Sequence, residues 1–560
     1  MTFDFGGLPL VTQGQQVQPA PVRVMRQARM GPLFLALLAL SCAGWSAAAQ
    51  ARPDGAQQAP EAQQAAAPGV KLAAEMPPPA APRPFPFPAS VTRTLPNGLR
   101  VFVVSARDRG ANSPVDPAVS VELLIRNAGA ARDPQGKAGL ATFTGDLLRQ
   151  GTEKRTAQEI AAAIDFVGGS LTANAGRDST TLRVSVVKKD FDLAMDLLSD
   201  VALHAKFAPE EIARRQQRMI SNFRVDYADA DYLASAVFRR MIFGLSAYGT
   251  PADGTPASVR AFTREELIAF RDQFYAPNES IMAFAGDITA DEAYAAAEKH
   301  LGRWTKKAAT TPVIAVPPRA GGLRILVVDK PDAVQTQIRV GRVGIPRNHP
   351  DYLPLTVTNQ IFGGGFNSRL NTAIRVNRGL SYGANAGFAS GLYAGNFIAD
   401  TFTRTETTAE ATKLVLDEIG RMASGEVSSD ELNVARDFLA GVFVIGSETP
   451  DQIAGRVSNA AFYGLPADYN QTYPAKVRAV TAEQVRQMAA RYFNAGDQDL
   501  VLAGNAAAFR EALRAAFPAA KYEEIAADQL DLLAPDLRRA EQEPATRPPA
   551  GTPGSSEPAR

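Results

Sequence analysis

The sequence predicts an α+β fold made of two homologous α/β-sandwich domains. Its 560 residues are too many for one hydrophobic core, and 46% of them are hydrophobic, as in ordinary globular proteins. Residues 98–104 (GLRVFVV) return as residues 322–328 (GLRILVV), which indicates an internal duplication. Strand and helix patterns also mix without the strict alternation of a doubly wound sheet.

Each copy is expected to open with a β-branched strand, at Val101–Val104 and at Ile325–Val328. Alternating apolar residues predict a strand over Thr180–Val186. Apolar residues at helical spacing predict an amphipathic helix over Asp190–His204. Later markers of the repeat keep nearly the same offset: Pro209–Ile212 resembles Ser429–Leu432, and Val259–Thr263 returns as Val477–Thr481.

The two ends of the chain differ in composition from its middle. Arg26 and Arg29 precede the apolar run Leu33–Gly44, and small residues follow, a pattern typical of a secretory signal. The following stretch, rich in Pro, Ala and Gln, is typical of a linker. We therefore expect a signal region at 1–50, a linker at 51–88, a first domain at 89–305, a second linker at 306–320, a second domain at 321–530 and a disordered tail at 531–560.

The apolar run near the N-terminus is too short to span a membrane, and no later run does so. Export across the inner membrane, to the periplasm, follows as the expected location. Cys42, the only cysteine, is an alternative site for a lipid anchor, although Ala39–Ser41 match the pattern for lipid attachment poorly. The folded part therefore has no disulfide and no thiolate for catalysis.

The charge balance excludes a nucleic-acid partner. Lys and Arg number 59 and Asp and Glu number 58, so there is no basic field to hold phosphates. The three histidines, His204, His300 and His349, are too far apart in sequence to share a helical turn. They are interpreted as incidental, with relocated zinc ligands as the alternative.

The segment 139–152, GLATFTGDLLRQGT, closely resembles the pattern GLAHFLEHMxFxGT of the pitrilysin / mitochondrial-processing-peptidase family. In that family of inverted zincins, H-x-x-E-H supplies two zinc ligands and a general base. Here Thr142, Gly145 and Asp146 stand at those three positions, and Asn222 falls near the position of the third ligand. The resemblance therefore implies the family frame without its metal, and no cofactor is expected in this chain.

A second resemblance lies in residues 362–382. After FGGGFNSRL the chain continues to Arg375, Gly379 and Tyr382, which match the family pattern R-x-x-x-G-L-x-Y. Ser368 is expected to cap a helix that Gly379 ends, with a strand following from Ser381. Arg375 and Tyr382 would then point to one spot beyond the helix. A solvated arginine and a half-buried tyrosine are the alternative.

Two further stretches bear on peptide binding. Gly363, Gly364 and Gly365 permit either a tight turn at the helix entry or the close approach of a peptide. Ala173, with Asp178 and Thr180 after it, also fits a family pattern, in which an edge strand pairs with substrate backbone. Here that strand is expected to serve packing.

The resemblance implies a half-clam of two domains that completes a partner's active site. The partner would be a homologous subunit with intact H-x-x-E-H and bound zinc. Arg375 would bind a substrate carbonyl and Tyr382 would stabilise the oxyanion during hydrolysis of unfolded peptides. A structural or assembly pseudoenzyme and an independent metallopeptidase are the alternatives. Cleavage preference, pathway and stoichiometry do not follow from the sequence.

Overall fold

The computed structural model describes residues 86–540 of the chain, with gaps at 107–116, 309, 313 and 320. The described residues lie in one compact unit. The predicted signal region, nearly all of the predicted linker 51–88 and residues 541–560 of the predicted tail lie outside them. Among the helices of the described part, none combines the length and the hydropathy that a membrane span needs.

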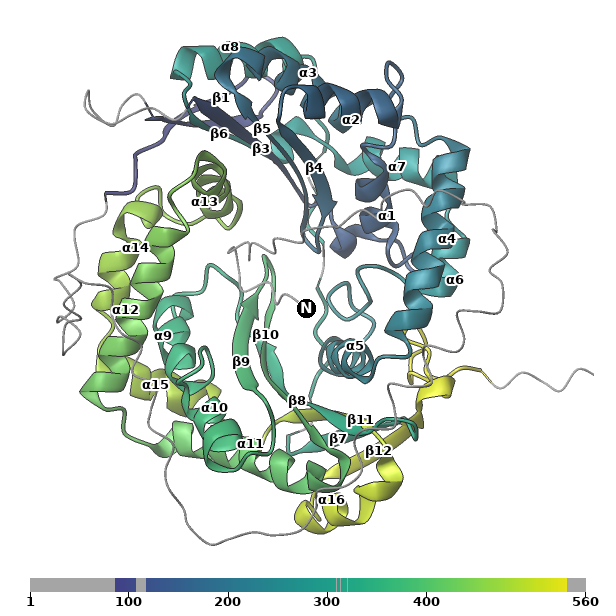
Figure 1. Cartoon of the computed structure of the whole chain (residues 1–560), viewed down its shortest axis with the longest axis vertical. Coiled ribbons are helices and arrows are strands. Elements are labelled where there is room, and N and C mark those ends of the chain that lie inside the picture. The colour runs from purple at the N-terminus through teal and green to yellow at the C-terminus, as the bar shows by residue number, and fades with distance from the viewer. Residues whose placement is uncertain (1–85, 107–116, 309, 313, 320, 541–560) are drawn as a thin grey trace, which may run out of the picture. The chain divides into compact units, whose positions relative to one another are not determined.

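The first domain is built on a six-stranded mixed sheet in the order β1-β2-β6-β3-β5-β4 (Figure 1). β2 and β6 pair in parallel, and the other neighbours are antiparallel. β6 is buried throughout, which is typical of a central strand covered on both faces. The strands are β1 (Val91–Thr94), β2 (Arg100–Ser105), β3 (Ala118–Arg126), β4 (Ser170–Ala175), β5 (Ser179–Val187) and β6 (Ser280–Gly286).

The second domain repeats this sheet in the order β12-β7-β11-β8-β10-β9. Five strands correspond one to one, and only the outer strand beside the first strand of the repeat differs. β1 is antiparallel to β2, whereas β12 is parallel to β7. The predicted α+β fold with two homologous domains is therefore confirmed. The strands are β7 (Arg324–Asp329), β8 (Gln335–Gly344), β9 (Ala384–Ser390), β10 (Gly395–Arg404), β11 (Asp499–Gly504) and β12 (Lys521–Ala526).

Many of the helices begin with side-chain caps. Thr156, Thr263 and Thr289 each form a capping box with a glutamate three residues later. The first domain has helices α1 (Leu140–Leu147), α2 (Ala157–Phe166), α3 (Phe191–His204), α4 (Pro209–Asp226), α5 (Ala230–Phe243), α6 (Pro256–Arg260), α7 (Arg264–Phe274) and α8 (Ala290–Leu301). The second has α9 (Tyr352–Phe362), α10 (Arg369–Asn371), the π-helical turn η5 (Thr372–Asn377), α11 (Thr408–Ser424), α12 (Ser429–Ile445), α13 (Pro450–Phe462), α14 (Tyr469–Arg478), α15 (Ala482–Tyr492) and α16 (Arg510–Ala516).

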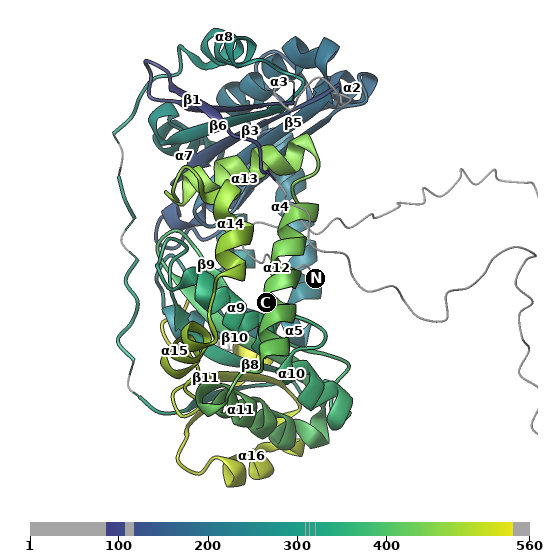
Figure 2. The same cartoon turned by 90° about the vertical axis from the view of Figure 1, so that its left-hand side faces the viewer.

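The two domains exchange helices. α5 of the first domain packs on β8 and β11 of the second, and α13 of the second domain packs on β3 and β6 of the first (Figure 1). Leu233 and Val237 of α5 share a buried cluster with Val501 of β11. Burial of apolar side chains from both domains in common clusters holds the two halves together. The segment between α8 and β7, which contains the predicted linker 306–320, runs along one side without a described helix or strand (Figure 2).

The ordered region extends beyond the predicted residues 89–530 at both ends. Phe87, placed in the linker, is buried and its ring centroid lies 6.1 Å from that of Phe443. The C-terminal end extends past 530, because Arg240 of α5 donates from Nε to the carbonyl oxygen of Leu532 at 2.8 Å. Leu532 itself is fully buried. These apolar anchors lie in short stretches rich in Pro or charged residues, whose composition resembles that of a linker or a tail.

Candidate functional site

α1 carries the positions at which the resembling family has its zinc motif. Its entry is fixed by Asp133, whose carboxylate accepts hydrogen bonds from the N–H groups of Gly139 at 2.7 Å and Ala141 at 2.8 Å. Burial raises the pKa of Asp133 to about 7, against these hydrogen bonds, which lower it. The helix is almost entirely buried, so its side chains are fixed by packing.

The residues at the zinc positions have other partners. Thr142 Oγ1 donates to the carbonyl oxygen of Ala252 at 2.8 Å. Asp146 is ion-paired with Arg215 of α4. Burial raises the pKa of the Asp146 carboxyl, and the Arg215 guanidinium opposes the rise. Asn222 is exposed on α4.

Gly145 allows α1 to lie directly against the edge strand β4. A Cβ atom at this position would be 2.8 Å from Cβ of Ala175 and 3.0 Å from its backbone nitrogen. A glutamate therefore has no room here unless β4 moves. Across the described residues, no group of three His, Cys, Asp or Glu side chains is placed to hold a metal ion. The residues present on α1 and α4 do not fit a catalytic zinc.

The structure brings Arg375 and Tyr382 together. The guanidinium carbon of Arg375 lies 4.4 Å from the ring centroid of Tyr382 and 4.7 Å from that of Phe366. Tyr382 is 78% exposed and Phe366 is 63% exposed. Within the described part of the chain, neither Arg375 nor Tyr382 forms an ion pair or a side-chain hydrogen bond. The stacking holds the guanidinium in place and leaves its donors available.

Backbone geometry explains how a pair seven residues apart can meet. Ser368 is the N-cap residue of α10, as expected, but its buried hydroxyl makes no capping hydrogen bond. The chain then widens into η5, and Gly379, at φ +59°, ends it with its N–H donating to the Arg375 carbonyl at 3.2 Å. The predicted strand start at Ser381 was wrong, because β9 begins at Ala384. Ser381 forms a local turn in which its hydroxyl accepts from the Gly383 N–H at 3.2 Å, which competes with strand pairing.

The three glycines 363–365 form the exit of α9. A Cβ at Gly363 would be 2.5 Å from that of Ala386 in β9, so the close approach here is to the chain's own strand. Gly363 also accepts a hydrogen bond from the Ala386 N–H at 2.9 Å. Gly364 and Gly365 lie against the side chain of Gln360. Their predicted role in substrate binding stays a prediction.

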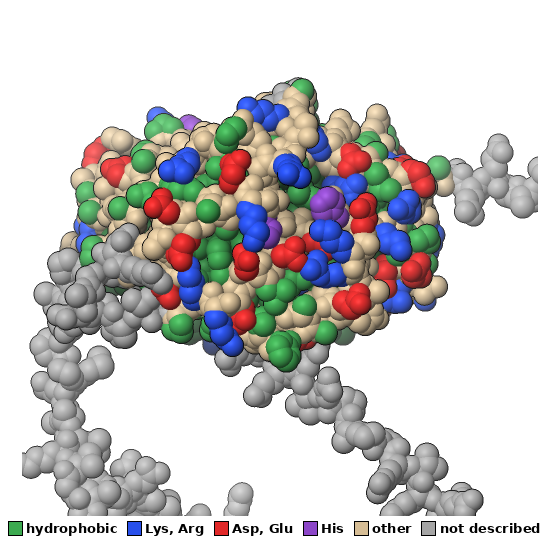
Figure 3. Space-filling view, turned by 90° about the horizontal axis from the view of Figure 1, so that it is seen from above, with side chains coloured by type: hydrophobic (Ala, Val, Ile, Leu, Met, Phe, Trp, Pro, Cys, Tyr) green, Lys and Arg blue, Asp and Glu red, His purple; other side chains and the backbone are tan. Residues whose placement is uncertain are grey.

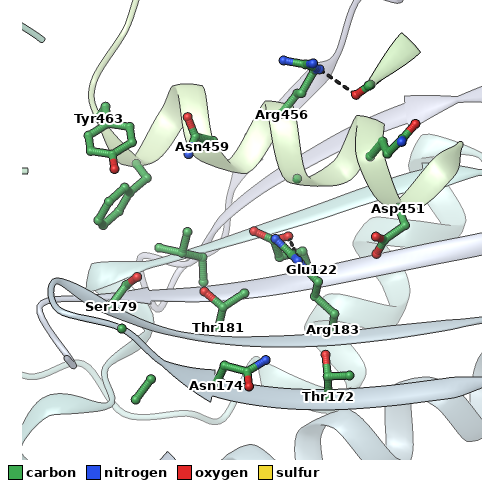
Figure 4. Close-up of a pocket in the computed structure, with 17 residues that line it drawn as sticks. Glu122, Thr172, Asn174, Ser179, Thr181, Arg183, Asp451, Arg456, Asn459 and Tyr463 are labelled. Atoms are coloured by element: carbon green, nitrogen blue, oxygen red, sulfur yellow. Dashed lines mark hydrogen bonds and ion pairs between the residues drawn. The ribbon is translucent and has the colours of Figure 1, made fainter. Parts of the chain in front are cut away.

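A polar pocket of about 370 Å³ lies between the first sheet and α13 (Figure 4). Its floor contains Glu122, which is 2% exposed and accepts hydrogen bonds from Arg183 Nε and Ser458 Oγ, each at 2.5 Å. Figure 4 shows Asp451 of α13 directed toward the strands and Arg456 directed away from them. The sequence analysis missed this pocket, because its two walls come from segments far apart in the chain.

β4 borders the pocket and is the outer strand of its sheet. It pairs with β5, and its exposed residues Thr172 and Asn174 line the pocket. The other side of the strand end contacts α1 through Ala175. The packing role expected for this strand is therefore seen, and its outer backbone edge has no described strand beside it.

Family comparisons identify the chain. The model of the insulinase family, peptidase family M16, matches residues 110–250, and the model of the peptidase M16 inactive domain matches residues 261–439. The chain belongs to the M16 peptidase family. The resemblance drawn from residues 139–152 and 362–382 is thus confirmed at the level of the family.

Relatives and solved structures of the M16 family cover most of the chain. A zinc protease of Mycobacterium leprae, described as uncharacterized, is 28% identical over 409 residues, which span 72% of this chain and 90% of the relative. One from Streptomyces coelicolor is 25% identical over 415 residues, covering 71% and 85%. The peptidase M16 inactive domain from Pseudomonas fluorescens superimposes with a TM-score of 0.68 at 25% identity, covering 74% and 98%. A protease from Helicobacter pylori, at 18% identity, TM-score 0.69 and coverage of 75% and 100%, shares the fold.

Within the M16 fold, the sequence located the pair Arg375 and Tyr382 but missed Phe366. Phe366 stands nine residues before Arg375, in the turn that precedes α10, so no helical periodicity links the two. The face over the first domain mixes acidic and basic side chains without a field of one sign (Figure 3). The chain is a peptidase-like member of its family.

Proposed function

We propose that this chain is the non-catalytic subunit of a heteromeric zinc metallopeptidase. It would supply Arg375 and Tyr382 to the active site of a homologous subunit that carries H-x-x-E-H and zinc. The substrates would be unfolded peptides. The observation that carries the proposal is the coexistence of an α1 that does not fit zinc with the Arg375–Tyr382 pair, in which Tyr382 is exposed and neither side chain has an ion-pair or hydrogen-bond partner among the described residues.

The geometry of the pair supports a role toward a ligand. Exposed arginines and tyrosines are usually mobile, and ordering them costs side-chain entropy. Here the guanidinium of Arg375 lies over two aromatic rings, and no described residue forms a hydrogen bond with the Tyr382 hydroxyl. A preorganised donor is the kind of group that stabilises developing negative charge on a carbonyl oxygen.

The edge strand β4 supports an extended peptide as the substrate form. Its exposed residues alternate with buried ones, and its outer backbone edge has no described strand partner. An extended chain can add to such an edge through backbone hydrogen bonds, while side chains enter the neighbouring pocket. In a folded protein most backbone N–H and C=O groups are already paired internally, so an unfolded peptide suits this edge better.

In the proposed complex the partner's zinc would polarise the scissile carbonyl and activate a water molecule. Arg375 would orient the peptide through a backbone carbonyl, and the Tyr382 hydroxyl would donate to the oxyanion of the tetrahedral intermediate. This donation strengthens as charge develops, so loss of the hydroxyl lowers kcat more than it raises KM.

The test is reconstitution with the zinc-bearing homologue and a fluorogenic peptide. Tyr382→Phe removes one oxygen and keeps the ring that stacks on Arg375. We expect kcat to fall by about 100-fold, as for other single oxyanion donors, with assembly unchanged by size-exclusion chromatography. Tyr492→Phe is the matched control, because its hydroxyl donates to Asp351 at 2.7 Å within this chain. That control should leave kcat unchanged.

Two outcomes would reject the proposal. If Tyr382→Phe assembles normally and turns over like the parent, the chain is a structural or assembly pseudoenzyme. If the purified chain alone holds one zinc and cleaves the peptide, it is an independent metallopeptidase. Metal analysis of the isolated chain separates this second outcome from carry-over of the partner.

A further inference from the structure

A cluster of arginine and tyrosine side chains lies in the second domain, and the proposed function does not use it. Arg347 follows β8 and is 7% exposed. Its guanidinium carbon lies 3.7 Å from the ring centroid of Tyr352 and 5.1 Å from that of Tyr469. Its Nη2 donates to the Tyr469 hydroxyl at 2.7 Å. These contacts fix a buried cation in one orientation.

A second arginine approaches the same place from α13. Arg456 lies over the ring of Phe443, at 3.9 Å from its centroid. Its Nε donates to the Gly446 carbonyl at 2.8 Å, and its Nη2 donates to the Phe443 carbonyl at 3.0 Å. Burial lowers the pKa of Arg456 to about 10, so it is still protonated at neutral pH.

Neither cation has a carboxylate partner among the described residues. By contrast, Arg339, which is 2% exposed, is ion-paired with Asp231. The cavity of about 90 Å³ beside Arg347 and Arg456 is lined by tyrosine, asparagine and apolar side chains and by no Asp or Glu. Two positive charges therefore share one small cavity without a counter-charge, an arrangement that is costly when left empty.

We propose that this cavity is a binding site for a small oxyanion, a phosphate or carboxylate group. Arginine carries planar pairs of N–H donors that match both groups. The cavity is also rich in donors beyond the two cations. Because the Tyr469 hydroxyl accepts from Arg347, its own proton is available to an anion. The Asn459 side chain also lines the cavity.

The site joins three segments of the second domain. Arg347 comes from the connection between β8 and α9, and Tyr352 is the first residue of α9. Arg456 comes from α13 and Tyr469 from α14. An anion bound here would draw together the helix that crosses to the first sheet and the sheet of its own domain. The proposal is independent of the partner subunit, because none of these residues belongs to α1 or to the Arg375–Tyr382 pair.

Thermal unfolding of the isolated chain tests the proposal. Sodium phosphate at millimolar concentration should raise the midpoint above that in sodium chloride of equal ionic strength, since ligand binding to the folded state stabilises it. Isothermal titration with phosphate should give one site per chain. Arg347→Lys keeps the charge and loses the planar fork, and should weaken phosphate binding about tenfold. Arg456→Gln should abolish it, and Arg404→Gln, at an exposed arginine, should leave it unchanged.

Further arms separate the two sources of the anion. Acetyl-dialanine with a free carboxylate, compared with its C-terminal amide, reports on peptide carboxylates, and inorganic phosphate reports on free anions. Binding of either one that is lost in Arg456→Gln supports the site. The proposal is overturned if no oxyanion binds beyond the effect of ionic strength. It is also overturned if binding persists undiminished in both Arg347→Lys and Arg456→Gln.

Discussion

Gly145→Ala measures how tightly α1 is pressed against β4. The added Cβ would be 2.8 Å from Cβ of Ala175 and 3.0 Å from its nitrogen, about 1 Å inside ordinary contact. Overpacking of this kind costs about 1–3 kcal/mol. Replacement of glycine by alanine inside a helix gains about 1 kcal/mol. We therefore expect a net loss of stability of up to about 2 kcal/mol.

Gly441→Ala is the matched control, because Gly441 lies inside α12 and a Cβ there would meet nothing within 4 Å. It should gain about 1 kcal/mol, so the two variants should differ by about 1–3 kcal/mol in urea unfolding followed by circular dichroism. Ala175→Gly should recover part of the stability that Gly145→Ala loses, because it removes the Cβ atom closest to the added methyl group. If Gly145→Ala stabilises the chain as much as Gly441→Ala does, β4 does not block α1. A glutamate at position 145 would then also fit beside β4.

Two further predictions concern the Arg375–Tyr382 pair and the first residues of α1. Phe366→Ala removes one of the two rings that stack on Arg375, and should lower kcat/KM of the reconstituted complex about 2–5-fold, as expected from a cation–π contact at an exposed site. A loss as large as that expected for Tyr382→Phe would instead place Phe366 in contact with the substrate. Burial raises the pKa of Asp133 from its ordinary value of 3.8 to about 7 in the folded state, so its stabilising contribution is complete below the lower value and is lost as pH rises through about 7. The difference in unfolding free energy between Asp133→Asn and the parent should therefore shrink between pH 5 and 8, and a difference that is constant with pH would contradict the assignment.

The duplication made the fold predictable, because it doubled each local signal. Val101–Val104 and Ile325–Val328 are short apolar runs that alone do not distinguish a strand from a buried helix segment. Their recurrence in the same context favoured strands, and they lie in β2 and β7. The exchange of α5 and α13 between domains left no such signal. An amphipathic helix shows which face is buried, but its sequence does not say which sheet covers that face.

Only the part of the site that is formed by residues close together in the chain could be predicted from the sequence. Arg375 and Tyr382 are close in sequence, and a helix followed by a glycine cap brings them together whatever the rest of the chain does. The polar pocket depends on Glu122 of β3 and Ser458 of α13, which meet only after the domains exchange helices. Sequence spacing cannot predict a contact of this kind, because the two residues are far apart in the chain and belong to different domains.

The contact between α1 and β4 also bears on the proposed binding of a peptide at the edge of β4. In this chain, Ala175 both fills the space beside Gly145 and lines the pocket next to the outer edge of β4, which has no strand partner among the described residues. Packing of α1 against this strand therefore holds the edge in a fixed position. A rigid edge lowers the entropy cost of adding a peptide strand, because the receiving backbone is already ordered. Under the proposed function, a fixed β4 edge would help this chain to position a peptide for the partner subunit.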